Sequence, residues 1–195
     1  ASASNYSLSS ATLNITQRPL NITATKAYDG NTTITSGSIT LSNLSGGQTI
    51  NTSGSITTNS ANVASYGTSD ITVSSLSLAD GTGAASNYTL SGGTYSASVT
   101  QKILGLTGSR IYNATTTASS SDLSLTGLVG SETLTLSGSG TLASSAVGTG
   151  KTITLNTLAI SNNTGLASNY NLSGTATMNV TTRAVTATGS RVYDG

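Results

Sequence analysis

The stretch "DITVSSLSL", residues 70–78, decides the fold class of this chain. Its apolar residues alternate with polar ones at Ile71 and Val73, and the alternation resumes at Leu76 after one extra residue. The stretch "TITLNTLAI", residues 152–160, repeats the pattern with the same slip. A period of two is typical of a β-strand and does not fit the 3.6-residue period of a helix. We interpret the slip as a β-bulge, and two short strands joined by a tight corner are the alternative.

Short runs with the same alternation occur along the whole chain, bounded by Gly, Asn and Ser, and none has helical spacing. We therefore predict an all-β fold in which each unit packs two sheets face to face, like a β-sandwich. β-Grasp-like or solenoid-type β units are the alternatives. Further strands are predicted at residues 12–16, 19–23, 38–41, 95–100, 133–136 and 175–181.

An internal repeat of about 82 residues organises the chain. The motif Ala-Ser-Asn-Tyr recurs at a constant spacing of 82 residues, with its tyrosine at Tyr6, Tyr88 and Tyr170. Self-similarity at a fixed period indicates tandem units of one fold. Because the chain begins inside this motif, we expect it to be a segment of something longer. We assign residues 1–16 to the C-terminal strands of a preceding repeat, 17–100 to repeat 1, 101–182 to repeat 2, and 183–195 to the first strand of a following repeat.

A second recurring segment, "TQRPLNITATKAYDG", opens each repeat, at residues 16–30, 100–114 and 181–195. It ends in a tyrosine and a turn dipeptide, and six of the seven Lys and Arg residues lie in it. We predict that the tyrosine ring packs at the end of its unit while Asp-Gly or Asn-Ala makes the turn. The predicted structural motif comprises Lys26, Tyr28, Asp29, Gly30, Arg110, Tyr112, Asn113, Arg191, Tyr193, Asp194 and Gly195, together with the pairs Asn5 and Tyr6, Asn87 and Tyr88, and Asn169 and Tyr170.

The two basic residues of each segment are eight positions apart, so an uninterrupted strand would place both on the buried face. We predict that a bulge turns the second basic residue outward and buries its apolar neighbour instead. The bulge is expected near Ala24, Gly108 and Gly189, and the neighbours expected in the core are Ala27, Ile111 and Val192.

No linker rich in Pro, Gly or charge separates the predicted repeats. The last strand of one repeat is expected to run almost directly into the first strand of the next, at some tens of Å per repeat. Such a junction leaves few free dihedral angles, so we predict an elongated, stiff rod whose partners are the neighbouring repeats of the same chain.

Composition excludes several classes of function. Charged residues make up 7% of the chain and the formal net charge is +1, which argues against nucleic-acid partners, and no run is long and apolar enough for membrane insertion. Histidine and cysteine are absent, and Glu132 is the only glutamate. Acid-base or nucleophilic catalysis needs a tuned titratable group and a partner that orients it. We therefore expect no enzyme, no cofactor and no metal site.

Four other uses of these residues are alternatives. Lys26, Tyr28 and Asp29 could form a sugar or anion site, and the loop at residues 78–83 could bind calcium, although it holds a single acid. A crosslink between lysine and asparagine would need a recurring lysine, but the equivalent residues are Lys26, Arg110 and Arg191. Flat rows of threonine suggest ice or glycan binding; they are Thr133 and Thr135, and Thr152 and Thr154.

"KAYDGNTT", residues 26–33, followed by "ASNYTL", residues 85–90, resembles the YDG-type repeat of large secreted bacterial surface proteins, especially filamentous-haemagglutinin-like adhesins. "VGTGKTITL", residues 147–155, resembles the family's glycine-lysine strand start, whereas repeat 1 has Asp70 in place of the lysine. "IYNA" in repeat 2 lacks both the acid and the glycine. The resemblance implies secretion to the bacterial cell surface and a role as stalk or spacer.

The predicted edge strands carry hardly any Lys, Glu or Pro that would block pairing with another chain. With a net charge near zero, we expect homotypic contacts that build a fibre or biofilm matrix. The expected function is thus that of a structural stalk or spacer in an adhesin or extracellular filament. A module that itself binds surface glycans is the alternative.

Overall fold

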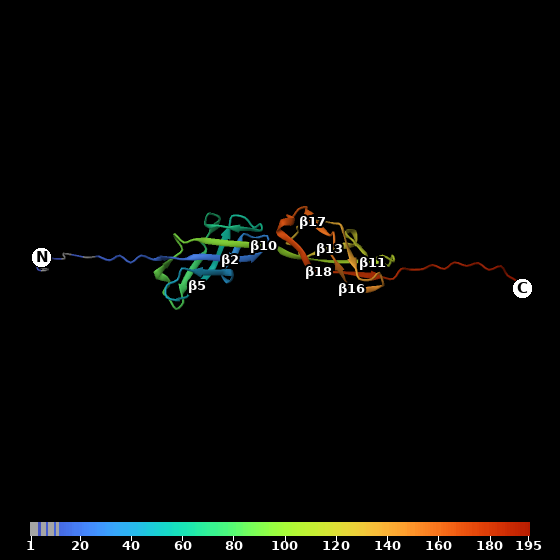
Figure 1. Cartoon of the computed structure of the whole chain (residues 1–195), viewed down its shortest axis with the longest axis horizontal. Coiled ribbons are helices and arrows are strands. Elements are labelled where there is room, and N and C mark those ends of the chain that lie inside the picture. The colour runs from blue at the N-terminus through green and yellow to red at the C-terminus, as the bar shows by residue number, and fades with distance from the viewer. Residues whose placement is uncertain (1–3, 5–6, 8–9, 11) are drawn as a thin grey trace. The chain divides into compact units, whose positions relative to one another are not determined.

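The computed structural model describes Ser4, Ser7, Ser10 and residues 12–195, and it is almost entirely β (Figure 1). The predicted all-β fold is confirmed. The described chain forms two compact units. Unit 1 contains the described residues up to Lys26 with Thr32–Ser60 and Ala64–Ser98, and unit 2 contains Ala27–Asn31, Ala61–Val63 and Val99–Gly195.

Ten strands lie in the first half of the chain. They are β1 Arg18–Pro19, β2 Asn21–Ala27, β3 Thr33–Thr35, β4 Ile39–Ser42, β5 Ile50–Thr58, β6 Ala64–Tyr66, β7 Ile71–Thr72, β8 Leu76–Asp80, β9 Tyr88–Thr89 and β10 Tyr95–Thr100. One four-stranded sheet has the order β4-β2-β10-β6, and a second joins β3, β5 and β7, with β8 also paired to β5. β1 pairs in parallel with β9, which brings Arg18 opposite Tyr88.

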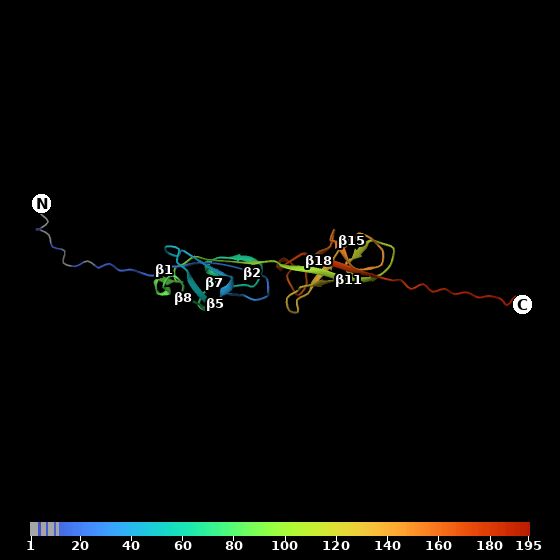
Figure 2. The same cartoon turned by 90° about the horizontal axis from the view of Figure 1, so that it is seen from below.

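Eight strands follow in unit 2. They are β11 Lys102–Ile111, β12 Thr117–Ser119, β13 Leu123–Thr126, β14 Leu134–Ser137, β15 Ser139–Leu142, β16 Gly148–Thr154, β17 Ala159–Asn162 and β18 Tyr170–Thr181. A six-stranded sheet has the order β12-β15-β16-β18-β11-β13, and β14 pairs with β17. The long strands β11 and β18 run side by side in parallel (Figures 1 and 2).

The remaining regular structure is short. Single 3-10 turns precede strands in both units, at η2 Ser36–Ser38, η3 Thr68–Asp70, η4 Ala85–Asn87, η5 Ser120–Asp122 and η6 Ala167–Asn169. Within the described part of the chain, no helix has the length and apolar character needed to cross a membrane.

The slip in alternation at residues 70–78 is a corner and not a bulge. β7 ends at Thr72, β8 begins at Leu76, and the Leu76 N–H closes a turn onto the Val73 carbonyl oxygen at 2.9 Å. In unit 2 the Leu158 N–H closes the same turn onto Leu155 at 2.8 Å. The bulge interpretation is wrong because the extra residues belong to a turn that links two different pairings, and the alternative of two short strands is right.

Close backbone approach explains a glycine at the same place in both units. Gly54 lies in β5 at φ +88°, and a Cβ there would stand 2.0 Å from the Ser75 carbonyl oxygen. Gly138, between β14 and β15, has φ +83° and would meet the Thr157 carbonyl oxygen at 2.1 Å. Only glycine lets the strand pass the corner of its neighbour at this distance.

The predicted bulge in the opening segment is also wrong. Along β2, buried and exposed residues alternate without interruption, so Ala24 and Tyr28 are buried while Ala27 is exposed. In β11, Arg110 is 9% exposed and Ile111 is 62% exposed, the reverse of the prediction.

The register of β11 against β18 shifts between Leu104 and Leu106 and not near Gly108. Around Gly189 the chain has no strand, and Val192 is 88% exposed. Residues 12–16, predicted as a strand, have no regular secondary structure.

The basic side chains can lie on the inward face because their charged groups donate hydrogen bonds to backbone oxygens. The guanidinium of Arg110 donates to the carbonyl oxygens of Thr115 and Thr117, and the Lys26 ammonium donates to the Thr33 carbonyl oxygen at 3.0 Å. A buried charge that is hydrogen-bonded in this way avoids most of its desolvation cost.

The cores are built from aliphatic residues and tyrosine, since the chain has no Phe or Trp. In unit 1, Leu20 and Ile56 are fully buried. In unit 2, one cluster joins β11, β12, β15, β16 and β18, with Leu106, Ala118, Leu142, Ile153 and Met178 among its members. Burial of each Leu, Ile or Met side chain contributes about 1.5–3 kcal/mol.

Candidate functional site

The segment that carries the Tyr-Asp-Gly sequence of repeat 1 belongs to unit 2. It leaves β2 at Ala27, and the Tyr28 N–H donates to the Thr100 carbonyl oxygen at 2.8 Å. The side chain of Tyr28 is only 5% exposed. The strand alternation that places Ile22 and Ala24 inward also places Tyr28 inward, so the ring enters unit 2 and not solvent.

Tyr28 and Tyr170 share one carboxylate. The Tyr28 hydroxyl donates to Glu132 Oε1 at 2.5 Å, and the Tyr170 hydroxyl donates to Glu132 Oε2 at 2.7 Å. The Tyr170 hydroxyl also accepts the Val129 N–H at 3.0 Å. The two rings meet edge to face, with centroids 5.4 Å apart and an interplanar angle of 80°. Hydrogen bonds to a charged acceptor are the strong ones, and the edge-to-face pair adds to them.

Both tyrosines hold their protons more tightly than usual. Burial, followed by the hydrogen bond and charge of Glu132, raises the pKa of Tyr28. Burial raises the pKa of Tyr170 to about 12, with Glu132 adding to the shift and the Val129 N–H opposing it. A tyrosinate beside the carboxylate would lack both water and a compensating charge. The hydroxyls therefore remain donors at all ordinary pH values.

A second segment of repeat 1, Ala61–Val63, also belongs to unit 2. Asn169 holds it: the Val63 N–H donates to Asn169 Oδ1 at 2.9 Å, and Asn169 Nδ2 donates to Asn62 Oδ1 at 2.9 Å. Asn169 is 1% exposed. A buried amide needs such partners. The Asn-Tyr pair of the repeat motif therefore contacts two segments, because Asn169 binds Ala61–Val63 and Tyr170 packs against Tyr28.

The two residues of the Asp-Gly turn have different structural roles. Asp29 Oδ1 accepts the Asn31 N–H at 2.9 Å and so closes the turn. Gly30 has φ +78°, and a Cβ there would stand 3.0 Å from Val129 Cγ1. Glycine is favoured here both by the left-handed backbone conformation and by the close approach of the valine.

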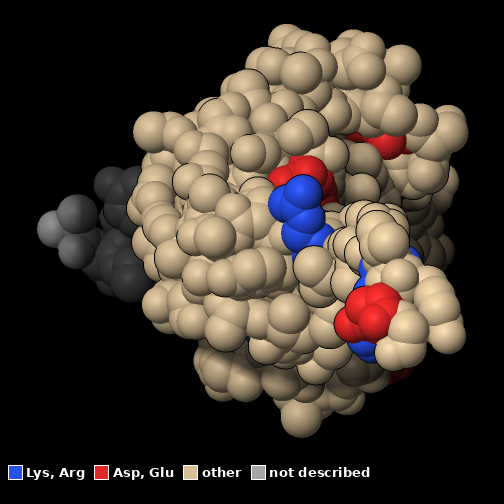
Figure 3. All heavy atoms as spheres, turned by 90° about the vertical axis from the view of Figure 1, so that its right-hand side faces the viewer, with Lys and Arg blue, Asp and Glu red and all other residues tan. Residues whose placement is uncertain are grey.

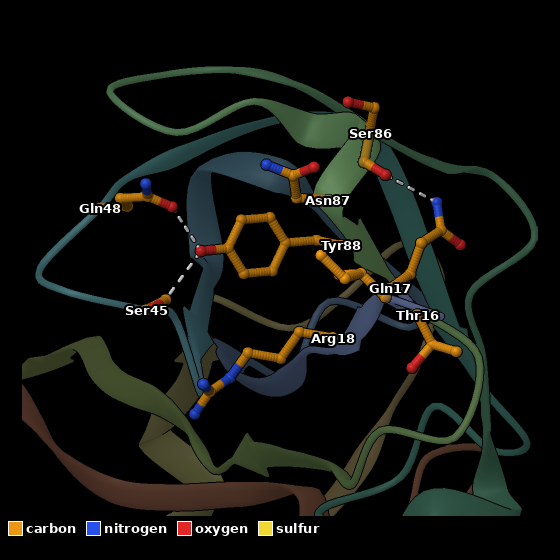
Figure 4. Close-up of a pocket in the computed structure, with 9 residues that line it drawn as sticks. Thr16, Gln17, Arg18, Ser45, Gln48, Ser86, Asn87 and Tyr88 are labelled. Carbon is orange, nitrogen blue, oxygen red and sulfur yellow. Dashed lines mark hydrogen bonds between the residues drawn. The ribbon is translucent and has the colours of Figure 1, made fainter. Parts of the chain in front are cut away.

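Unit 1 repeats the receiving half of this arrangement. The Tyr88 hydroxyl donates to Gln48 Oε1 at 2.6 Å and accepts the Ser45 N–H at 3.1 Å (Figure 4). Beside Tyr88 lies a pocket of about 490 Å³, whose lining includes Ile15, Thr16, Arg18, Ser45, Gln48 and Tyr88. The counterpart of Glu132 is therefore Gln48, which presents one oxygen and one amide group in place of two oxygens.

The comparisons with known proteins agree with this repeated geometry. The family model described as the YDG domain matches residues 14–98 and again residues 95–178. The chain belongs to the YDG-domain family. No curated protein and no solved structure matches it. The two YDG domains are thus adjacent, as the prediction of neighbouring repeats requires.

The tyrosine of the second YDG domain has the same backbone contact but an open side chain. The Tyr112 N–H donates to the Thr181 carbonyl oxygen at 2.8 Å, as Tyr28 does to Thr100. Asn113 Oδ1 accepts the Thr115 N–H at 3.2 Å, which replaces the role of Asp29. Ala114 keeps the left-handed turn at φ +63°. Tyr112 is 37% exposed.

The other predicted motif residues fall outside these contacts. Arg191 and Asp194 form an exposed ion pair at 2.5 Å, Tyr193 is 91% exposed, and Gly195 has φ +80°. Asn87 is exposed beside the unit 1 pocket. Asn5 and Tyr6 lie outside the described residues.

The alternative sites are not assembled as the sequence allowed. The Lys26 ammonium is bonded at Thr33 and the Tyr28 hydroxyl at Glu132, so these two do not converge on one ligand with Asp29. Asp80 Oδ1 accepts the Ala85 N–H at 2.7 Å and caps its loop, as Asn162 does for Ala167. Among the described residues, no three His, Cys, Asp or Glu side chains are grouped for a metal.

The threonine rows follow ordinary strand alternation. Thr152 and Thr154 are exposed and flank the buried Ile153, and Thr135 is exposed next to the buried Leu134. Thr133 bonds through its hydroxyl to Thr164 at 2.9 Å.

Sequence reasoning missed Glu132, Val129 and the segment Ala61–Val63. One signal was available, because Glu132 is the only glutamate in the chain and aligns with Gln48 between two apolar runs. The partners of that carboxylate could not be read from the sequence, since Tyr28 stands 104 residues away.

Proposed function

We propose that the YDG domains of this chain form a structural stalk or spacer in a secreted bacterial surface adhesin or matrix fibre. The observation that carries the proposal is the hydrogen bond of Tyr28 to Glu132, which ties the turn of the first YDG domain into unit 2. Tyr28 is thus a buried member of unit 2, although its sequence belongs to the first YDG domain.

Backbone continuity supports the same role. β10 ends at Thr100 and β11 begins at Lys102, so Gln101 is the only residue between the two strands. The amide of Gln101 donates to the carbonyl oxygens of Ser168 and Tyr170, at 3.2 and 3.0 Å. The connection thus has none of the Gly- and Ser-rich sequence that is typical of flexible linkers.

The chemistry of the surface favours contacts between chains over catalysis. Few charged side chains lie on the face drawn in Figure 3, and the formal net charge of the whole chain is +1. Ile103 and Ile111 are more than 60% exposed on β11. Weak electrostatic repulsion and exposed apolar residues support lateral association into filaments.

Small-angle scattering on chains of two and four YDG domains tests the spacer role. A spacer predicts a largest dimension that rises by the same amount for each added domain, and no binding on a glycan array. Specific glycan hits with no such growth would favour the alternative, in which the YDG domains themselves bind a surface.

A further inference from the structure

The pocket beside Tyr88 in unit 1 corresponds to the space that Tyr28 fills in unit 2. In unit 2 that space is closed by the Tyr28 ring, which packs edge-on against Tyr170. In unit 1 the equivalent space is the pocket, and Tyr88 and Arg18 line it (Figure 4). The two units therefore share the receiving tyrosine and differ in the occupant. Two receiving residues also differ, because unit 1 has Gln48 and Ser45 where unit 2 has Glu132 and Val129.

Three contacts of the receiving side are the same in both units. First, the tyrosine hydroxyl donates to the side chain of Gln48 in unit 1 and of Glu132 in unit 2. Second, the same hydroxyl accepts the backbone N–H of Ser45 or Val129. Third, the amide of Gln17 or Gln101 donates to the carbonyl oxygen of Ser86 or Ser168. These three hydrogen bonds hold the receiving tyrosine and the backbone beside it in the same way in both units.

We propose that the pocket beside Tyr88 receives the tyrosine turn of another YDG domain joined ahead of Gln17, in the way that unit 2 receives Tyr28. The incoming N–H would pair with the Thr16 carbonyl oxygen, which corresponds to Thr100 in unit 2. This inference rests on the proposed function, because a tandem array is what holds such a partner at high local concentration.

The turn of the second YDG domain has the chemistry that this pocket needs. Tyr112 is 37% exposed and directly follows β11, as Tyr28 directly follows β2. Its turn has Ala114 where the first turn has Gly30. The pocket has Ser45 where unit 2 has Val129, so the methyl group of Ala114 replaces the space that the valine side chain takes up in unit 2.

The polarity of the pocket is also complementary. Gln48 Oε1 already accepts the Tyr88 hydroxyl, which leaves the Nε2 amide as a donor. An incoming hydroxyl would therefore accept from Gln48 Nε2, whereas Tyr28 donates to Glu132. A tyrosine hydroxyl can do either, so the same side chain fits both sites.

The contact between Val63 and Asn169 in unit 2 also has a possible counterpart at the unit 1 pocket. In unit 2, Asn169 accepts the Val63 N–H. Val147 is 50% exposed and stands the same number of residues after Tyr112 as Val63 stands after Tyr28. Asn87, the counterpart of Asn169, is exposed in unit 1 and available to receive the Val147 N–H.

Cysteine trapping in a joined chain tests the proposal. The chain contains no cysteine, so two copies can be linked with residue 181 of the first followed by Gln17 of the second, with Ala114→Cys in the first copy and Ser45→Cys in the second. We expect the disulfide to form about tenfold faster, or more, than in a control pair that replaces Ser45→Cys by Ser38→Cys. Ser38 is exposed and lies at the opposite end of β4 from Ser45.

Equal rates for the two pairs would overturn the proposal. So would trapping between separate, unjoined copies at the rate seen in the joined chain, because the occupant would then be a second molecule. The circular dichroism melting curves of all cysteine variants are compared first, so that loss of fold is not taken for loss of docking.

A substitution pair without cysteine keeps the test independent of trapping chemistry. In the joined chain, Ser45→Val should crowd Ala114 and lower the melting temperature, and Ala114→Gly should restore it. In the single chain the pocket is open, so Ser45→Val should leave the melting temperature unchanged. Equal effects of Ser45→Val in both chains would contradict docking.

The docking and the proposed function fail separately. If scattering shows equal growth in length per domain but trapping is at the control rate, the docking inference is wrong and the spacer role stands. If trapping succeeds but the joined chain is no longer than the single chain, the spacer role is wrong and the docking stands.

Discussion

Tyr28 places its hydroxyl 2.5 Å from Glu132 Oε1, although 104 residues separate the two in the sequence. The contact explains why a tyrosine precedes the Asp-Gly turn of the first YDG domain. Tyr28 is the side chain that lies within unit 2. The turn after it places Gly30 against Val129, which orients the tyrosine hydroxyl toward Glu132.

Removal of the shared carboxylate should destabilise unit 2 more than removal of its counterpart destabilises unit 1. Glu132→Ala leaves two buried hydroxyls without their acceptor, which should cost about 2–4 kcal/mol in the free energy of unfolding. Gln48→Ala removes the acceptor of one hydroxyl and should cost about 1–2 kcal/mol. Urea denaturation measures both, and equal losses would argue against the shared-carboxylate arrangement.

The tyrosine hydroxyls supply a matched pair of conservative substitutions. Tyr28→Phe removes a donor to the partly buried Glu132 carboxylate and should lower the free energy of unfolding by about 1.5–3 kcal/mol. Tyr112→Phe changes a partly exposed side chain and should alter it by no more than about 0.5 kcal/mol. Thermal unfolding of the two variants checks this; a large effect at Tyr112 would mean that its hydroxyl has a buried partner.

Gly30 should be among the least replaceable residues of the turn. Gly30→Ala puts a Cβ at φ +78° and 3.0 Å from Val129 Cγ1, so we expect a loss of about 1–3 kcal/mol. Gly46→Ala is the control, because Gly46 has φ +56° but no atom within 4 Å of the added Cβ. The loss in Gly30→Ala minus the loss in Gly46→Ala measures the cost of the contact with Val129. Adding Val129→Ala to Gly30→Ala should remove this cost and leave the cost of the backbone conformation.

Alkaline pH should unfold unit 2 through its tyrosines. Their pKa values are raised in the fold, to about 12 for Tyr170, so the folded state holds these protons more tightly than the unfolded state, where the pKa is about 10. The stabilisation is complete below pH 10 and is lost as the pH rises through about 12. Unfolding free energies between pH 8 and 11.5 measure the loss, which should be smaller in Tyr28→Phe. A flat profile would contradict the raised pKa values.

Alternation and repetition carried the sequence prediction as far as fold class. The period of two at residues 70–78 and 152–160 predicts strands because each strand buries one face, and the structure confirms an all-β fold. The same rule alone would also have placed Lys26 and Arg110 correctly. The added bulge was wrong because alternation says which way a side chain points, and not that backbone oxygens at Thr33 and Thr117 receive its charged tip.

The candidate site was only half predictable. The recurrence of Asn-Tyr and Tyr-Asp-Gly identified Asn169, Tyr170 and Tyr28 as structural residues. Their meeting at Glu132 depends on a contact between distant segments, and the motif copies do not reveal it because unit 1 has Gln48 at the equivalent place. Pairing of distant segments is set by packing, which no local pattern encodes.

Small-angle scattering from chains of two and four YDG domains, each with and without the pair Tyr28→Ala and Glu132→Ala, is the most direct test of the spacer account. We predict equal growth of the largest dimension per added domain in the unmodified chains, and a broader distribution of distances in the variants. A largest dimension that does not grow with domain number, or that is insensitive to loss of the Tyr28–Glu132 contact, would contradict the account.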